Sequence, residues 1–134
     1  MTETVRDRQA MLAGLSPSLQ PGQLVFCAAD EDWARHQPLG MFREAEGVSL
    51  ILDRDQAEAE GFSVADPMRL ITLNVYSALD GVGLTAAVAS ALAEAGIACN
   101  MVAALRHDHV LVPAEQAEAA LRILQDLQTS SSAP

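Results

Sequence analysis

The chain has 134 residues, half of them hydrophobic, and carries a formal net charge of −10 with 8 basic side chains, all of them arginine. This length is enough for one domain, or for two small ones that share a core. An acidic chain with scattered arginines cannot neutralise a row of phosphates, so the composition argues against nucleic acid and anionic membranes as partners. Aromatic residues make up only 4% of the chain, so we expect an aliphatic core in which helices pack on a sheet.

The N-terminal residues lack the apolar stretch of a signal peptide, and no apolar run approaches membrane-spanning length. We therefore expect a cytoplasmic protein without a membrane partner. The two cysteines, Cys27 and Cys99, lie in apolar stretches and have no spacing that would bind zinc. Both are expected to be free and buried.

The chain begins with a polar segment that leads into one short predicted helix. The apolar side of this helix consists of Met11, Leu12 and Leu15. Residues 16–22, SPSLQPG, combine two prolines with a glycine. This composition predicts a turn that interrupts any regular element.

Two strands are predicted in the remainder of the first half. They cover residues 22–29 and 47–52, which are short, rich in strand-forming side chains and bounded by turn residues. The acidic segment 29–40 between them is predicted to be an irregular link. A helix of about two turns follows, in which Asp53 is expected to be the N-cap and Gly61 the C-terminal stop.

The second half predicts strand, helix, strand, strand and helix. The first strand covers residues 69–76, and its apolar pattern indicates a central place in the sheet. The helix that follows ends at Gly96, and later strands are predicted over 97–105 and 110–112. One continuous stripe marks the buried side of that helix: Leu84, Val88, Ala91, Leu92 and Ala95.

The last helix is predicted to begin at Pro113, after a turn over residues 106–109. Residues 129–134 are predicted to be a disordered tail. This βαββα order is close to one half of a ferredoxin-like arrangement that lacks its final strand. Since the first half cannot close a sheet alone, we expect an α+β fold with one antiparallel-rich sheet and helices on one side.

Four segments in order resemble the small bacterial ACT-domain proteins long labelled a domain of unknown function. They are LSPSLQPGQLVFC, FREAEGVSLIL, NVYSALDGVGLTAAVASALAEAGIACN and HDHVLVP. The resemblance implies a tandem ACT-type architecture, with a truncated unit over residues 1–66 packed on a more complete unit over 67–128. It also implies a regulatory role, a small-molecule effector of the amino-acid class and pairing into a homodimer. Ser77-Ala78 departs from the two serines common in that family, and Leu105-Arg106 replaces an expected aromatic residue.

The glycine-rich loop over residues 77–83 is the main binding candidate. A loop that runs into a helix N-terminus exposes unpaired N–H groups and favours an anion such as an α-carboxylate. Gly81 and Gly83 would let a ligand approach the backbone, while Asp80 is suited either to cap the helix or to bind an α-ammonium group. Asn100 is expected near this loop. The competing interpretation of the loop is a plain capped turn.

The full set of candidate ligand-binding residues is Ser77, Leu79, Asp80, Gly81, Val82, Gly83, Asn100, Arg43, Glu44, His107 and His109. Arg43 has the geometry to clamp a carboxylate with two hydrogen bonds. No nucleophile and base stand at a diagnostic spacing, so no catalytic residue is predicted. The leading hypothesis is a non-enzymatic sensor of an amino acid or similar anionic metabolite, with no cofactor and no metal.

Two alternatives remain open from the sequence. In a strand, His107 and His109 would share one face while Asp108 points away, so a third ligand from Glu44 or Glu46 would complete a metal site. The chain would then be a metal-binding protein or a metal-dependent enzyme. The other alternative is a structural dimerisation module without any ligand.

Overall fold

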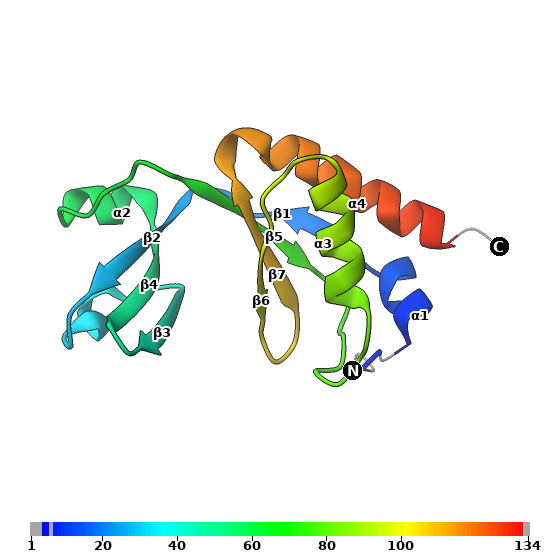
Figure 1. The fold of residues 1–134 in the computed structure, drawn as a ribbon, viewed down its shortest axis with the longest axis horizontal. Coiled ribbons are helices and arrows are strands. Elements are labelled where there is room, and N and C mark those ends of the chain that lie inside the picture. The colour runs from blue at the N-terminus through cyan, green and yellow to red at the C-terminus, as the bar shows by residue number, and fades with distance from the viewer. Residues whose placement is uncertain (1–3, 6, 133–134) are drawn as a thin grey trace.

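The computed structural model describes residues 4–5 and 7–132 (Figure 1). The helices are α1 (Arg8–Ala13), α2 (Arg54–Ala59), α3 (Leu84–Glu94) and α4 (Ala117–Ser132), with short 3₁₀ helices η1 (Trp33–His36) and η2 (Ala114–Gln116). The strands are β1 (Pro17–Leu19), β2 (Leu24–Ala29), β3 (Gly40–Glu44), β4 (Gly47–Asp53), β5 (Met68–Leu73), β6 (Asn100–Ala103) and β7 (Asp108–Pro113). Of the described helices, none is long and apolar enough to cross a membrane. The cytoplasmic location stays a prediction.

The strands form one sheet in the order β3-β4-β2-β5-β7-β6, and β1 pairs with residues 71–73 of β5. All pairings between these strands are antiparallel. The two halves of the sheet meet through a single residue pair, Leu24 with Met68. The predicted antiparallel-rich sheet is therefore confirmed, as is the central place of β5.

The helices cover one face of this sheet (Figure 1). In the second half, α1, α3 and α4 enclose the side chains of β5 and β7 that alternate toward them, such as Ile71, Leu73 and Val110. In the first half, α2 contributes Ala57 to a smaller cluster with Val25, Leu50 and Leu52 of β2 and β4. Because Leu24 and Met68 are paired on the other face, side-chain alternation places both clusters on the same side of the sheet.

The second half obtains its fourth strand from the N-terminal part of the chain. The predicted βαββα order lacks a final strand, and β1 takes the vacant edge beside β5. The adjoining α1 places Met11, Leu12 and Leu15 in the same core as α3 and α4. The division between units at residue 66 stays a prediction. Although α1 and β1 precede this residue in the chain, they pack on the second half.

Local signals in the sequence set several element boundaries as predicted. The Asp53 carboxylate accepts a hydrogen bond from the Gln56 amide, at 3.1 Å, and so caps α2. Gly61 and Gly96 have φ angles of +87° and +74°, which suits glycine residues that follow a helix. Cys27 is buried and free as expected, whereas free Cys99 is only half-buried.

Several predictions of local structure were wrong, and the strands predicted over 69–76 and 97–105 cover only β5 and β6 as bounded above. Residues 17–19 were expected to lie in a turn but form β1, because the edge of β5 offers them a partner. The first half contains a third strand, β3, which pairs with β4 in a hairpin. β7 begins at Asp108, so the turn lies earlier than the predicted 106–109. Helix α4 continues to Ser132 instead of ending before a disordered tail at 129, while residues 133–134 lie outside the described residues.

Candidate ligand-binding site

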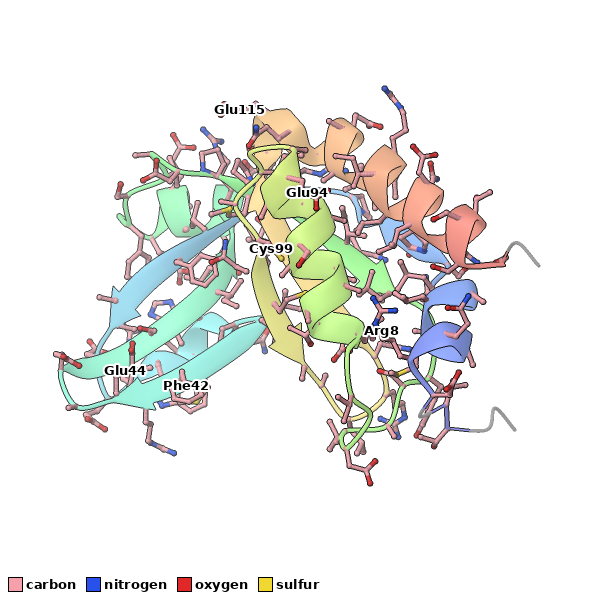
Figure 2. The ribbon with its side chains drawn as sticks, turned by 45° about the vertical axis from the view of Figure 1, so that its right-hand side comes forward. Arg8, Phe42, Glu44, Glu94, Cys99 and Glu115 are labelled. Carbon is pink, nitrogen blue, oxygen red and sulfur yellow. The ribbon has the colours of Figure 1, made fainter. Side chains whose placement is uncertain are left out.

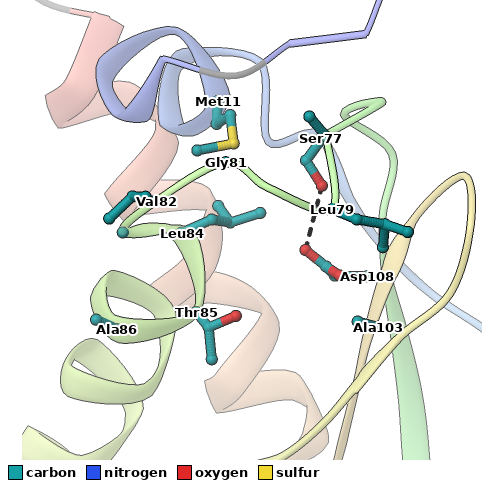
Figure 3. A pocket seen from close by; sticks show the side chains of 12 residues that line it. Met11, Ser77, Leu79, Gly81, Val82, Leu84, Thr85, Ala86, Ala103 and Asp108 are labelled. Carbon is teal, nitrogen blue, oxygen red and sulfur yellow. Dashed lines mark hydrogen bonds between the residues drawn. The ribbon is translucent and has the colours of Figure 1, made fainter.

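A cavity of about 520 Å³ lies between the loop over residues 77–83, the first turn of α3 and the hairpin of β6 and β7 (Figure 3). Its lining residues come from four separate parts of the chain: Met11, Ser77, Ala78, Leu79, Gly81, Val82, Gly83, Leu84, Thr85, Ala86, Ala103 and Asp108. Five of the predicted ligand-binding residues, those at 77, 79, 81, 82 and 83, are thus brought together around one space.

Backbone hydrogen bonds hold the start of this loop against the N-terminal segment. The Val5 amide donates to the Tyr76 carbonyl at 2.7 Å, and the Ala78 amide donates to the Val5 carbonyl at 2.8 Å. Just before the loop, the Asn74 side-chain amide donates to the Ser16 carbonyl at 2.8 Å. The loop is therefore positioned by residues that lie about seventy positions earlier in the chain, which requires the tertiary fold.

Gly83 occupies the N-cap of α3 with a φ of +104°. The prediction that Asp80 caps this helix is therefore wrong. A Cβ at Gly83 would lie only 2.7 Å from Cδ of Arg8, whose side chain fills the space beside it. Figure 2 shows Arg8 between α1 and the beginning of α3. The first intrahelical bond is donated by Ala87, so the preceding amides of the first turn have no intrahelical acceptor. These amides and the helix dipole favour an anion in the cavity.

The opposite wall of the cavity carries a carboxylate. Asp108 begins β7, and its Oδ2 accepts a hydrogen bond from the Ser77 hydroxyl at 3.2 Å (Figure 3). Ser77 is only 7% exposed, so this pair is partly shielded from water. The cavity therefore has main-chain amides that would suit an anion and a carboxylate that would suit a cation, and most of its other lining side chains are aliphatic.

Asp80 faces a neighbouring cavity of about 280 Å³ that also borders Ser77, Leu79 and Leu105. The remaining predicted residues of the first half lie elsewhere. Figure 2 shows Glu44 on the β3–β4 hairpin, away from α3, where it accepts a hydrogen bond from Ser49. Arg43 belongs to the same strand. Neither residue lines the cavity.

Asn100 also lies outside the cavity, because it stands at the end of β6 opposite to the lining residue Ala103. Its side-chain amide donates to the Leu111 carbonyl at 3.3 Å. The expectation that Asn100 approaches the loop is therefore wrong.

The two histidines make separate contacts instead of forming one face of a strand. His107 precedes β7; its Nδ1 lies 3.4 Å from the Val75 carbonyl, and its ring packs edge-on to Tyr76. His109 lies within β7, with Nδ1 3.1 Å from the Thr72 hydroxyl. Burial lowers the pKa of His109, neighbouring His107 lowers it further, and Asp108 opposes the shift.

The metal alternative finds no third ligand among the residues that the structure describes. Across the described part of the chain, no group of three or more His, Cys, Asp or Glu side chains is arranged to hold a metal ion. Of the two residues proposed as the additional ligand, Glu44 is engaged with Ser49 on the β3–β4 hairpin, and Glu46 is exposed in the turn of that hairpin. The arrangement therefore favours the loop cavity over the His-Asp-His segment.

Sequence reasoning missed several residues that line the cavity, chiefly Asp108 and Met11. Asp108 had a usable signal, since a residue between two histidines of a strand points to the opposite face. That face is the one the helices cover. For Met11 the sequence contains no such signal, because the approach of Met11 to the loop depends on how α1 packs.

Comparisons with known proteins agree with this fold. An ACT-domain family model matches residues 4–69, and a second one matches residues 67–126. A search of curated proteins found no match. Among solved structures, a protein of unknown function from Vibrio cholerae, described as a possible transport protein, is 39% identical, with a TM-score of 0.81, 90% of this chain covered and 94% of that chain.

Two more distant structures share the fold. A protein from Agrobacterium tumefaciens is 20% identical with a TM-score of 0.68, over 84% of this chain and 87% of that one. The regulatory subunit of aspartate kinase from Thermus thermophilus is 13% identical with a TM-score of 0.62, over 85% of this chain and 97% of that one. The matches place the chain in a class of small α+β modules that are typically regulatory and bind small molecules. The chain belongs to the ACT-domain family, as its motifs had indicated.

Proposed function

We propose that this chain binds a free amino acid, or a small metabolite with the same charges, beside residues 77–83 and acts as a sensor without catalysis. The cavity of about 520 Å³ carries this proposal. Pockets for small molecules commonly measure roughly 300–1,000 Å³ and combine an apolar lining with a few polar groups. ACT domains are typically regulatory modules that bind small effectors, so family and cavity point to the same kind of function.

The distribution of charge in the cavity matches an α-amino acid. The amides of the first turn of α3, which have no intrahelical acceptor, suit the α-carboxylate. The Asp108 carboxylate, oriented by the Ser77 hydroxyl, suits the α-ammonium group. Leu79, Val82 and Leu84 leave an aliphatic surface for the side chain of the ligand.

The surroundings of the Ser77 hydroxyl support binding without catalysis. The Ser77 hydroxyl donates to a carboxylate, which is a weak base for activating serine. No histidine is among the residues that line the described cavity. The site therefore offers recognition groups but no activated nucleophile.

The test is a thermal-shift panel of the proteinogenic amino acids at millimolar concentration. A ligand at a hundred times its Kd adds about 2.7 kcal/mol of stability, enough to raise the Tm of a chain of this length by roughly 10 °C. Asp108→Asn is expected to weaken binding about tenfold or more, because a charged hydrogen bond is lost.

Glu44→Gln is the matched control, since Glu44 also accepts a hydrogen bond from a serine hydroxyl but lies outside the cavity. It should leave binding unchanged. The proposal fails if no amino acid shifts the wild-type Tm, or if the two variants weaken binding equally.

We also propose that the chain forms a homodimer through the sheet face that the helices leave uncovered. Phe42 is 72% exposed and Phe26 is 49% exposed, both on that face. An apolar groove of about 150 Å³ lies there, with Ile51, Leu70 and Leu111 in its wall. Contiguous exposed apolar surface of this kind marks an interaction site. Light scattering should report a dimer for the wild type and a monomer for Phe42→Glu; a wild-type monomer would refute this proposal.

A further inference from the structure

The N-terminal helix α1 reaches the cavity from outside the βαββα run that forms the rest of the site. Its C-terminal end is held by α4, where the Gln128 side-chain amide donates to the Ala13 carbonyl at 2.9 Å. The same Gln128 side chain accepts from the Ser16 amide at 2.9 Å. At the other end, Arg8 packs its stem against Gly83. Helix α1 is therefore fixed at both ends and forms a firm boundary of the site.

Met11 is the residue through which α1 contributes to the cavity. It is 1% exposed and belongs to the main core, yet it lines the cavity. Figure 3 shows its thioether near Gly81 and Leu84, on the side of the cavity away from Asp108 and Ala103. Leu79 and Val82, by contrast, are 69% and 80% exposed, so they are far less confined by neighbouring side chains. Among the apolar side chains that line the cavity, Met11 and Leu84 are therefore the deeply buried ones.

We propose that Met11 is a specificity-determining residue, which limits how large a ligand side chain the buried end of the site accepts. This inference rests on the proposed function. With the α-groups held by the first turn of α3 and by Asp108, the part of the ligand side chain that reaches the buried end of the cavity meets Met11. A buried thioether at that end excludes atoms that would overlap it, and the surrounding core prevents it from moving aside.

Leu12 provides a matched control on the same helix. It is 2% exposed and lies in the same core cluster as Met11, but it does not line the cavity. Truncating either residue removes a large apolar side chain from one core, so the two variants should lose similar stability. Only the Met11 variant should change which ligands bind.

The experiment is isothermal titration of glycine, alanine, valine, leucine and methionine into the full chain and its Met11→Ala, Met11→Phe and Leu12→Ala variants. The measured quantity is the affinity for leucine relative to alanine. Met11→Ala should raise this ratio about tenfold, and Met11→Phe should lower it by a similar factor, since a methylene in an apolar pocket is worth roughly tenfold or more. Leu12→Ala should leave the ratio within about twofold.

Opposite changes for Met11→Ala and Met11→Phe would not arise from a general loss of stability. If either variant fails to fold, as judged by circular dichroism, the other still decides the question. A ratio unchanged in the folded Met11 variants, or shifted equally by Leu12→Ala, overturns the role of Met11 while leaving amino-acid binding intact. If the wild type binds none of the five amino acids, the role of Met11 falls together with the proposed function.

Discussion

The two halves of the sheet are built from similar elements but bury very different cores. In the first half, β2, β4 and α2 enclose six buried residues, and the cluster is bordered by half-buried side chains such as Trp33 and Met41. In the second half, β5, β7 and three helices enclose fifteen. Helices α3 and α4 supply six of these fifteen residues, and the N-terminal segment adds three more because α1 and β1 pack on the second half instead of the first.

This difference also explains where the large loop cavity lies. The first half has the hairpin of β3 and β4, whose polar side chains project into solvent. In the second half, the N-terminal segment contacts the loop before α3. The segment, the loop and Asp108 together enclose the cavity of the candidate site. We conclude that the N-terminal segment both enlarges the core and shapes the candidate site.

Leucine truncation in each half tests whether the second core dominates stability. Leu73 and Leu50 are both fully buried, one in each cluster. Leu73→Ala should lower the free energy of unfolding by about 3–5 kcal/mol, and Leu50→Ala by about 2–3 kcal/mol. The smaller cost is expected because half-buried Met41 and Trp33 can move into the space that Leu50 leaves. Urea unfolding followed by circular dichroism measures both values, and an equal or reversed order would contradict the comparison.

Glycine substitutions test the contact between the N-terminal segment and the second half. Gly61 in the first half and Gly83 in the second both have positive φ, at +87° and +104°. A Cβ at Gly61 meets nothing within 4 Å, whereas a Cβ at Gly83 meets the Arg8 stem at 2.7 Å. Gly61→Ala should therefore cost about 1 kcal/mol from backbone strain alone, and Gly83→Ala about 2–3 kcal/mol.

Removing the stem of Arg8 separates the two contributions at Gly83. In the background of Arg8→Ala, the alanine at position 83 should cost only about 1 kcal/mol, close to the value for Gly61→Ala. The measurement is a double-mutant cycle from urea unfolding. Additive costs for Arg8→Ala and Gly83→Ala would show that Arg8 does not confine this glycine.

Elements with strong local signals could be predicted from the sequence, on both sides of this comparison. The apolar stripe of α3 predicted this helix. Gly96 predicted its end, because the residue after the helix has a positive φ that favours glycine. Strand β3 carried no such signal. Three of its five residues are exposed, so Phe42, Arg43 and Glu44 show no alternation that would distinguish a strand from a loop.

What sequence reasoning missed depends on contacts between distant residues. Residues 17–19 have turn composition, and they are a strand only because β5 presents a free edge to them. The loop over residues 77–83 was predictable as a binding candidate from its glycines and the helix after it. Met11 was not, since nothing local indicates that it meets that loop.

Acidification should affect the two halves in separate pH ranges. In the second half, burial first and then His107 lower the pKa of His109 below its ordinary value of 6.5. In the first half, the hydrogen bond from His36 lowers the pKa of Glu60 below its ordinary value of 4.5, and a bond from Gln56 adds to this. In both cases the folded chain binds fewer protons than the unfolded chain. Each group therefore contributes stability that is present above its ordinary pKa and is lost as the pH falls through its lowered value.

The loss of stability on acidification is small, but the pH at which it begins differs between the two halves. Urea midpoints measured from about pH 7.5 down to 4 should begin to fall below about 6.5, and fall again below about 4.5. His109→Gln should remove the first decline, because glutamine can still bond to the Thr72 hydroxyl without titrating. Glu60→Gln should remove only the second, as glutamine retains an acceptor for His36. If either variant flattened both declines, the two halves would respond to protons as one unit, against the separation that their distinct cores imply.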